Sequence, residues 1–474
     1  MERSQRRLAL VVLCAAQLML IVDVVALNVA LPSMQRSLRI PVGQLQLVGV
    51  AYTLTFGSLL VVAGRTGDVF GRRRLFRIGI AVFTLASLVN VLAPNAPLLF
   101  AGRALQGIGA ALVSPAALSM LTSSFPEGEL RNRALGIWAA VGAVGAILGQ
   151  VVGGTITDLF GWRTVFLINV PIGIAAASSV GRLVPESFGD RQRLDLRGAA
   201  MLTAALSVLT LSLTRVGEHD VDAVVVAGLA ASALLLAWFW STERRHSQPL
   251  VKPSLLAERG VHVGNGVLAL LAGGTASALF FATLYLQGPL GYSPFSVGVA
   301  FAPVTVIVLL VSPMAAKHVG RIGARRMMLL GSGCIAVGLL VLSRMAAGGS
   351  YITDVLPGLA LIALGNGLGY APTMIAATAG VGDDDQGVAS GLIGTSQELG
   401  TAISLAVVAP VAAAVARSAS GPVAAIDGYQ AGVLVAAGLV AAAIALALRT
   451  PPRLGLADAP VVDINPPIAT EDAA

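Results

Sequence analysis

Fourteen apolar runs, each long enough to cross a lipid bilayer as a helix, constrain the fold of this chain more than any other feature. About 20 mainly apolar residues in a helix span the hydrocarbon core of a bilayer. The runs lie near residues 8–31, 44–64, 75–93, 97–121, 134–157, 164–182, 198–214, 221–240, 262–286, 296–316, 326–346, 354–378, 387–415 and 429–448. The sequence therefore predicts an all-α polytopic membrane protein with 14 transmembrane helices.

Composition agrees with this class and excludes several others. Only 12% of the residues are charged and 56% are hydrophobic, whereas about 25% of the residues of a soluble domain are charged. The two cysteines, Cys14 and Cys334, fall inside apolar runs, so we expect neither a disulfide framework nor a zinc site. The net charge of +7 comes from residues spread between the runs, so we expect no nucleic-acid partner.

The basic residues favour one side of the predicted membrane. With the N-terminus inside, 24 of the 31 lysines and arginines fall on inner segments or at the inner ends of runs, six fall on the outer side, and Arg103 alone lies well inside a run. Cytoplasmic loops carry such an excess, so we expect both termini in the cytoplasm. The first run is too long for a signal peptide and lacks a small-residue cleavage site, so we expect a retained helix. The scarcity of lysine beside abundant alanine and glycine suggests a GC-rich bacterial genome, so we expect the membrane to be that of a bacterial cell.

Two segments of similar sequence indicate an internal repeat. "GRTGDVFGRRRLF" (64–76) and "AKHVGRIGARRMM" (316–328) align when Gly71 is placed on Gly323, and each follows a run that leads to the inner side. Parallel halves are typical of transporters that bind substrate at the interface between the halves. We expect a six-helix half at residues 1–182, two additional helices and an inner loop at 183–260, a second six-helix half at 261–448, and a disordered tail at 449–474.

Five motifs resemble a known family. "GRTGDVFGRRR" is similar to the loop signature Gly-x-x-x-Asp-x-x-Gly-Arg-Arg of the major facilitator superfamily. "LIVDVVALNVALPSM", "GRALQGIGAAL", "GWRTVFLINVPIG" and "YLQGPLGYSPFSVG" resemble the 14-span drug/proton antiporter branch of that family. The resemblance implies the major facilitator fold, with two inserted helices between the halves, and multidrug efflux in exchange for protons.

Two charged residues lie within the predicted membrane in the first half. Asp23 is about 15 residues into its helix, or ~22 Å deep, and Arg103 starts ~9 Å from the outer end of the fourth run. Their depths match, and an intramembrane charge is a functional candidate that usually faces a partner. The resemblance implies proton transfer at Arg103 and cation or proton binding at Asp23. The alternative is a static ion pair that joins the two helices.

Glu398 is the only acidic residue well inside a run of the second half, about 12 residues into the thirteenth run. Burial disfavours the charged form of a carboxyl group, so a site like this can exchange protons and give one up to a cationic substrate. Competition between a proton and a substrate for one site is sufficient for antiport. The alternative is a glutamate hydrogen-bonded to Gln397 or to the backbone.

Amide side chains are further candidates for the wall of a substrate cavity. The same side chains also join membrane helices through hydrogen bonds, and each of them fits that role individually. These residues are Asn28, Gln106, Gln150, Asn366 and Gln397.

The inner loop after the second run carries the signature residues Gly64, Asp68, Gly71, Arg72 and Arg73. The glycines permit a tight turn and close helix approach, and arginines suit an inner surface that carries anionic lipid. The resemblance implies a cytoplasmic gate, in which the aspartate and arginines hold the halves together in one facing state. We expect three acids before the thirteenth run to meet Arg72, Arg73 or Arg74 when this gate is closed. These inner-gate acids are Asp383, Asp384 and Asp385.

The fifth run departs from the family pattern. The antiporter motif of the family ends Gly-Pro-x-x-Gly-Gly, whereas this chain reads "GQVVGG" at residues 149–154. The small residues Gly145, Gly149, Gly153 and Gly154 keep the spacing that allows close packing against a neighbouring helix. The proline kink is absent because Gln150 restores a backbone donor. This change either weakens strict antiport or is neutral.

The motifs favour a secondary transporter that exports hydrophobic or cationic drugs by alternating access. A facilitator or proton symporter for a small polar metabolite is one alternative, and a non-transporting membrane receptor or scaffold is another. We expect no enzyme, because the four histidines lie in or beside loops with no catalytic constellation. No Gly-rich loop ends in Lys-Ser or Lys-Thr, so we expect the proton gradient, rather than a cofactor or ATP, to supply energy. The expected partners are a lipophilic small molecule, protons and the bilayer.

Overall fold

A computed structural model of the chain describes residues 3–40, 47–125, 128–189, 195–218, 222–246, 249–418 and 424–450. All regular elements in these ranges are helical, which confirms the predicted all-α class. The first group of helices is α1 (Arg3–Leu38), α3 (Leu47–Phe70), α4 (Arg72–Leu92), α5 (Ala96–Ser124), α6 (Glu129–Phe160), α7 (Arg163–Leu167) and α8 (Asn169–Leu183).

Two long helices, α9 (Leu196–Glu218) and α10 (Ala223–Glu243), and a short one, α11 (Pro253–Ala257), connect this group to the second. The second group is α12 (Arg259–Gln287), α13 (Pro294–Ala300), α14 (Ala302–Ile322), α15 (Ala324–Leu342), α16 (Leu356–Thr378), α17 (Gln386–Ser418) and α18 (Ala424–Ala447). A π-helical turn, η1 (Tyr351–Val355), precedes α16, and a 3₁₀ turn, η2 (Asp383–Asp385), precedes α17.

Within the described ranges, 13 helical segments are long and apolar enough to cross a membrane. Each of them coincides with one of the predicted runs. The remaining predicted run, 134–157, lies inside the 32-residue helix α6, so the count of 14 stays a prediction.

The sixth predicted run is a broken helix. Helix α7 ends at Leu167 and α8 begins at Asn169. Pro171 has no backbone N–H to donate to the carbonyl of Leu167, four residues earlier, and this removes one helical hydrogen bond at the break. Asn169 is the first residue of α8 and is buried.

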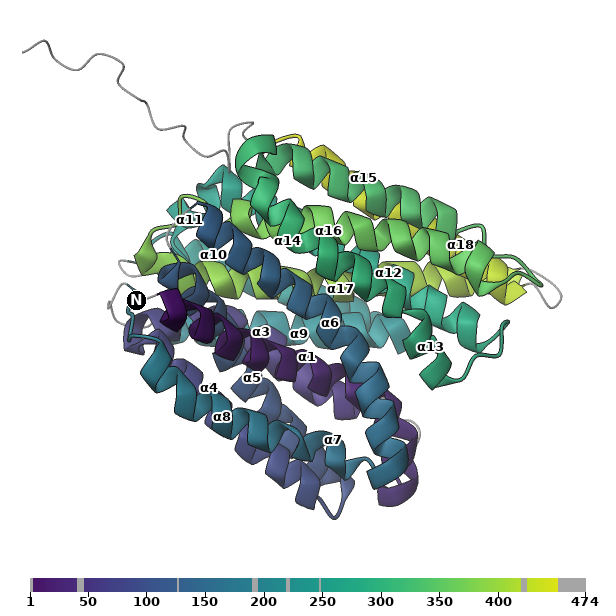
Figure 1. Ribbon diagram of the computed structural model, residues 1–474, viewed down its shortest axis with the longest axis horizontal. Helices are drawn as coiled ribbons and strands as arrows, with labels where there is room; N and C mark the ends of the chain where they lie inside the picture. Colours follow the sequence, from purple (N-terminus) through teal and green to yellow (C-terminus); the bar gives the residue numbers. More distant parts are fainter. Residues whose placement is uncertain are drawn as a thin grey trace, which may run out of the picture.

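The helices form two neighbouring groups. In Figure 1, α4, α5 and α8 lie in the lower part of the molecule, and α12, α15, α16 and α18 lie in the upper part. The groups meet where α3 and α5 pack against α17 and where α6 packs against α14 and α16. Helix α9 packs against both α3 and α17. The N-terminus and α11 lie at one end of the bundle, which we call the inner end because it is predicted to face the cytoplasm.

The two aligned glycines occupy equivalent turns. Gly71 separates α3 from α4 with φ of 103°, and Gly323 separates α14 from α15 with φ of 88°. Positive φ is readily adopted only by glycine, so both positions require this residue. The sequence repeat therefore corresponds to a repeated backbone turn.

The glycine-rich face of α6 packs directly against α1. A Cβ on Gly145 would lie 2.8 Å from Cγ2 of Ile21, and one on Gly149 would lie 2.7 Å from Cβ of Val25. A Cβ on Gly153 would meet Ala26 in the same way. The expected close packing of this helix is present. Gly154 is buried as well, and α6 runs without interruption through residue 150, which is consistent with the missing proline.

Replacing Gly149 with valine is expected to lower the unfolding temperature of the purified protein, because the new side chain would overlap Val25. Overpacking of this kind costs about 1 to 3 kcal/mol. Gly142→Val is the matched control, because it lies on the same helix and no atom of the described residues lies within 4 Å of its Cβ position. Thermal unfolding in detergent measures the difference, and equal midpoints for the two variants would contradict this packing.

Candidate functional site

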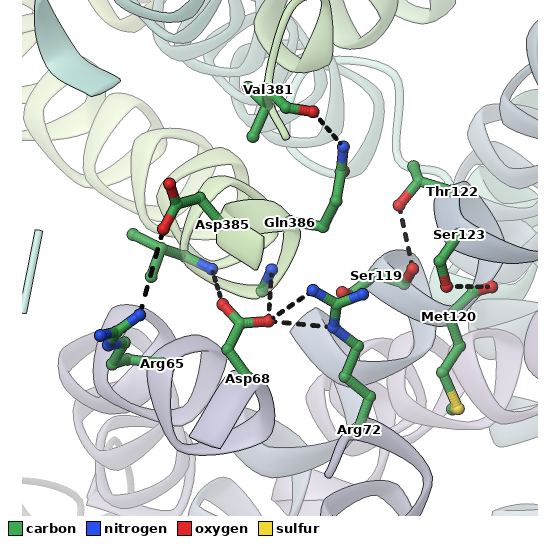
Figure 2. Close-up of polar contacts among 12 residues, drawn as sticks. Arg65, Asp68, Arg72, Ser119, Met120, Thr122, Ser123, Val381, Asp385 and Gln386 are labelled. Carbon is green, nitrogen blue, oxygen red and sulfur yellow. Dashed lines mark hydrogen bonds and ion pairs between the residues drawn. The ribbon is translucent and has the colours of Figure 1, made fainter. Parts of the chain in front are cut away.

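Asp68, near the inner end of α3, connects the two groups of helices (Figure 2). Its Oδ1 accepts hydrogen bonds from Nε and Nη2 of Arg72 at 2.9 and 2.7 Å. The same carboxylate accepts hydrogen bonds from the backbone N–H groups of Gly387 and Val388 at 3.0 and 3.1 Å. Both belong to the first turn of α17, where N–H groups have no acceptor within the helix. Asp68 is fully buried, so this carboxylate joins α3 to α17 in a site closed to water.

Glycines bring the backbones of α3 and α17 into contact beside Asp68. A Cβ on Gly64 would overlap the carbonyl oxygen of Gly387, and a Cβ on Gly387 would overlap the carbonyl oxygen of Gly64. One turn further along α17, a Cβ on Gly391 would lie 2.6 Å from the carbonyl oxygen of Leu60. No side chain fits at these positions without separating the helices, so the inner end of this interface is closed.

For Asp385, the predicted pairing with Arg72, Arg73 or Arg74 was wrong. Asp385 lies 3.1 Å from Nζ of Lys252, and its other oxygen lies 4.0 Å from Nη1 of Arg65. Arg65 is three residues before Asp68 on α3 and therefore shares its face toward α17. Arg72 instead turns back onto Asp68, one helical turn earlier. Asp385 thus connects α3 to the loop before α11.

The other acids and arginines of this region have different surroundings. Arg73 lies 3.6 Å from Glu186, and it donates hydrogen bonds from Nη1 to the carbonyl oxygens of Gly181 and Val184 at the end of α8. Arg74 and Asp384 are exposed. The side chain of Asp383 lies outside the described part of the structure.

A second buried cluster surrounds Asp23 in the outer half of the first group. Nη1 of Arg103 lies 2.5 Å from Oδ2 of Asp23, and both side chains are almost completely buried. Nε of Arg103 donates a hydrogen bond to the carbonyl oxygen of Val48 at 3.1 Å. The pairing expected from their matching depths is present.

Amide and hydroxyl groups complete the hydrogen bonds of Asp23. Oδ1 of Asp23 accepts hydrogen bonds from Nδ2 of Asn169 at 2.6 Å and from Nε2 of Gln106 at 3.2 Å. Gln106 also accepts from Asn90 at 2.6 Å and donates to Ser87 at 2.8 Å. Sequence reasoning missed Asn169, Asn90 and Ser87. The sequence could have indicated these three residues, because each is a polar residue within an apolar run.

Aromatic rings cover the guanidinium group of Arg103. Its Cζ lies 4.5 Å from the ring centroid of Tyr52 and 5.8 Å from that of Phe166. Cation–π contacts of this kind strengthen when water is excluded. Helices α1, α3, α4, α5 and α8 and the short α7 therefore enclose one positive and one negative charge together with their hydrogen-bonding groups.

Glu398 lies on the face of α17 that meets α3, further from the inner end than the glycine contacts. A Cβ on Gly57 of α3 would lie 3.9 Å from Cβ of Glu398. The side chain is half-buried, and the described residues give it no hydrogen bond or ion pair, to Gln397 or to any other group. At 1.5 Å per residue, Glu398 is ~16 Å along α17 from Gly387. It therefore lies at the interface between the two groups of helices, near mid-depth.

The remaining predicted residues are dispersed. Asn366 on α16 exchanges hydrogen bonds with Thr275 on α12 at 3.0 and 3.1 Å, which joins two helices. Gln397 is half-buried. The side chains of Asn28 and Gln150 lie outside the described part of the structure. Among the described residues, no group of three or more histidine, cysteine, aspartate or glutamate side chains could hold a metal ion.

Comparison with known proteins gives the same architecture. The human organic anion transporter MFSD10 superposes with a TM-score of 0.67 at 16% identity, covering 94% of this chain and 100% of its own. A proton:xylose symporter superposes with a TM-score of 0.67 at 15% identity, covering 96% of this chain and 98% of its own. At these identities the likeness concerns the fold alone.

Several known proteins share more sequence identity with this chain than these two structures do. The cephamycin export protein of Amycolatopsis lactamdurans is 37% identical, covering 98% of this chain and 96% of its own. The puromycin resistance protein of Streptomyces alboniger is 36% identical, covering 93% and 89% of the two chains. The lincomycin resistance protein of Streptomyces lincolnensis is 35% identical, covering 85% and 84%.

A family model matches most of the chain as well. The model of the Major Facilitator Superfamily covers residues 13–405, which include Asp23, Asp68, Arg103 and Glu398. Together with the apolar helices and the bacterial relatives, this match makes the chain a multi-pass cell-membrane protein. The chain belongs to the Major Facilitator Superfamily.

Proposed function

We propose that this protein exports a lipophilic drug or antibiotic across the cell membrane in exchange for protons. The observation that carries the proposal is the set of relatives that match nearly the whole chain, among them a cephamycin export protein and a puromycin resistance protein. The few polar groups along the apolar helices agree with a permissive, largely apolar binding site. Members of this family are carriers and not enzymes, and they need no cofactor.

Glu398 is the proposed site of proton exchange. A carboxyl group in a low-dielectric site without a basic partner favours its neutral form, and the described residues give Glu398 no such partner. Its place at the interface of α3 and α17 lets it face either side of the membrane as the two groups of helices move. A cationic substrate entering beside Glu398 would displace the proton, and exit of the substrate would allow reprotonation.

The Asp23 cluster is the proposed second element of coupling. Its buried ion pair is not directly at the interface of the two groups, but it packs through α5 and α3 against α17. Protonation of Asp23 would remove the negative charge that stabilises Arg103, so the packing of α1 against α5 would respond to proton binding. Residues 1–182 and 261–448 are the proposed moving halves, and the Asp68 contact is the proposed inner gate.

Replacing Glu398 with glutamine is expected to abolish substrate-dependent proton flux, because glutamine keeps the shape of the side chain but carries no exchangeable carboxyl proton. The measurement uses proteoliposomes with a lumenal pH dye, an imposed pH gradient, and a panel of lipophilic cations and neutral antibiotics. Gln397→Glu in the Glu398→Gln background is the matched control, because it restores a carboxyl group at an adjacent position about 100° around the helix.

The same assay distinguishes the alternatives. Substrate movement without proton flux in the wild-type protein would overturn proton coupling and indicate a facilitator, with Gln150 the first residue to test. Proton flux in the direction of the substrate would indicate a symporter. If the protein binds compounds of the panel but transports none of them, it is a receptor or scaffold.

A further inference from the structure

Two basic hollows lie at the inner end of the molecule, apart from the residues assigned above to coupling. The first, of about 600 Å³, lies between α4 and the segment that follows α8. The second, of about 420 Å³, lies between the starts of α12 and α15 and the segment that follows α18. Both volumes fall within the range of small-molecule sites.

Several arginine side chains line each hollow. Arg74 and Arg77 line the first, together with Arg73, which pairs with Glu186. In the second, the basic side chains come from three separate segments of the chain, and none of the described lining residues is acidic. These side chains are Arg259, His262, Arg325 and Arg449.

The two hollows occupy corresponding places in the repeat. The alignment that puts Gly71 on Gly323 also puts Arg73 on Arg325, and each of these arginines lines one hollow. In each group of helices the hollow lies between the start of the helix after the positive-φ glycine and the end of the last helix. Arginines that serve only as membrane anchors need not converge on a hollow, let alone twice in equivalent places.

Apolar side chains extend from the first hollow toward the membrane. Ile78 and Ala81 follow Arg74 and Arg77 along α4 and are exposed, and Phe70 is 52% exposed at the end of α3. In the second hollow, Leu448 is 51% exposed beside Arg449. A ligand for such a site carries a negative head group and an apolar tail.

We propose that each hollow binds the head group of one anionic glycerophospholipid of the inner leaflet. Arginine recognises phosphate oxygens through paired N–H groups, and basic pockets between transmembrane helices on the cytoplasmic side suit anionic lipid head groups. The phosphate lies among the arginines of each hollow, and in the first hollow the acyl chains follow Ile78 and Ala81. This assignment does not depend on the transported substrate.

Native mass spectrometry of the protein in detergent, titrated with phosphatidylglycerol or phosphatidylcholine, tests the proposal. The wild-type protein is expected to retain two molecules of phosphatidylglycerol in preference to phosphatidylcholine. Arg74→Gln/Arg77→Gln and Arg259→Gln/Arg449→Gln are each expected to retain one, and the variant with all four changes none. Arg74→Lys/Arg77→Lys keeps the charge and is expected to retain most of the binding.

Arg197→Gln/Arg321→Gln is the matched control, because both arginines are exposed at the inner end and line neither hollow. It is expected to bind lipid as the wild type does. Equal lipid retention by this control and the four-substitution variant would overturn the proposal. Release of the lipid by millimolar inorganic phosphate would also overturn it, by assigning the hollows to a soluble anion. Unchanged thermal unfolding in lipid-free detergent shows that each variant is folded.

Discussion

Replacing Asp23 with asparagine is expected to abolish proton-coupled transport and to lower the unfolding temperature. Asparagine keeps the shape of the side chain and a hydrogen-bond acceptor for Asn169 and Gln106, but it leaves Arg103 charged and buried without a counter-charge. Removing one partner of a buried ion pair costs about 3 to 5 kcal/mol. Proton flux in proteoliposomes and thermal unfolding in detergent measure the two effects.

The double variant Asp23→Asn/Arg103→Gln separates a coupling role from a static ion pair. With both charges removed, no charge is left buried without a partner, so much of the stability is expected to return. If the pair takes part in coupling, substrate-dependent proton flux stays absent in this stable protein. Recovery of transport together with stability would contradict the coupling role and leave the ion pair with a structural one.

The matched control for this experiment is Asp222→Asn. Asp222 caps α10 and lies 2.7 Å from Arg215 in an exposed ion pair. The guanidinium of Arg215 lowers the pKa of Asp222 from its usual value, but exposed pairs contribute little to stability, and asparagine is an equally good cap. We expect transport and unfolding temperature close to those of the wild-type protein.

Replacing Gly64 with alanine is expected to reduce transport at least about tenfold, which corresponds to 1.4 kcal/mol or more in the free energy of closing the inner end. The added Cβ would overlap the carbonyl oxygen of Gly387, a backbone atom that cannot move without α17. Separation of α3 from α17 would also break the hydrogen bonds from Gly387 and Val388 to Asp68. The inner end would then stay open.

Accessibility of a buried cysteine tests this directly. Ser390 is buried on α17 between the glycine contacts, so Ser390→Cys, in a protein without Cys14 and Cys334, reports opening of the inner end to a water-soluble maleimide. Labelling is expected to increase in the Gly64→Ala protein. Gly49→Ala is the control on the same helix, because no atom of the described residues lies within 4 Å of its Cβ position. Wild-type labelling and transport in the Gly64→Ala protein would contradict a gate at this contact.

Much of the candidate site could be predicted from the depth of each charged residue in the membrane. The position of Asp23 and of Arg103 along their helices predicted that the two side chains meet, and they lie 2.5 Å apart. A residue's depth depends only on its place in an apolar run, because the rise per residue is fixed at 1.5 Å. The same argument placed Glu398 about 12 residues into the thirteenth run, well inside the membrane.

Depth along a helix does not predict which charged side chains pair with each other. Asp385 pairs with Lys252 and Arg65 rather than with Arg72, Arg73 or Arg74, although all of these residues lie near one end of the bundle. Each step along a helix turns the side chain by about 100°, so the direction of a charge depends on how the helices are rotated against each other. Asn169 shows the same limit, because its place in an apolar run does not give the direction of its side chain, which donates a hydrogen bond to Asp23.

The sequence by itself determined the class of protein, the positions of its apolar helices and its family, because run length and short motifs are local properties. The tertiary structure decided which polar groups meet. It closed the inner end through backbone contacts of Gly64 and Gly387, surrounded Asp23 with groups from α5 and α8, and left Glu398 without a partner among the described residues. These outcomes depend on the rotation and separation of packed helices, which are set by contacts between residues far apart in the chain.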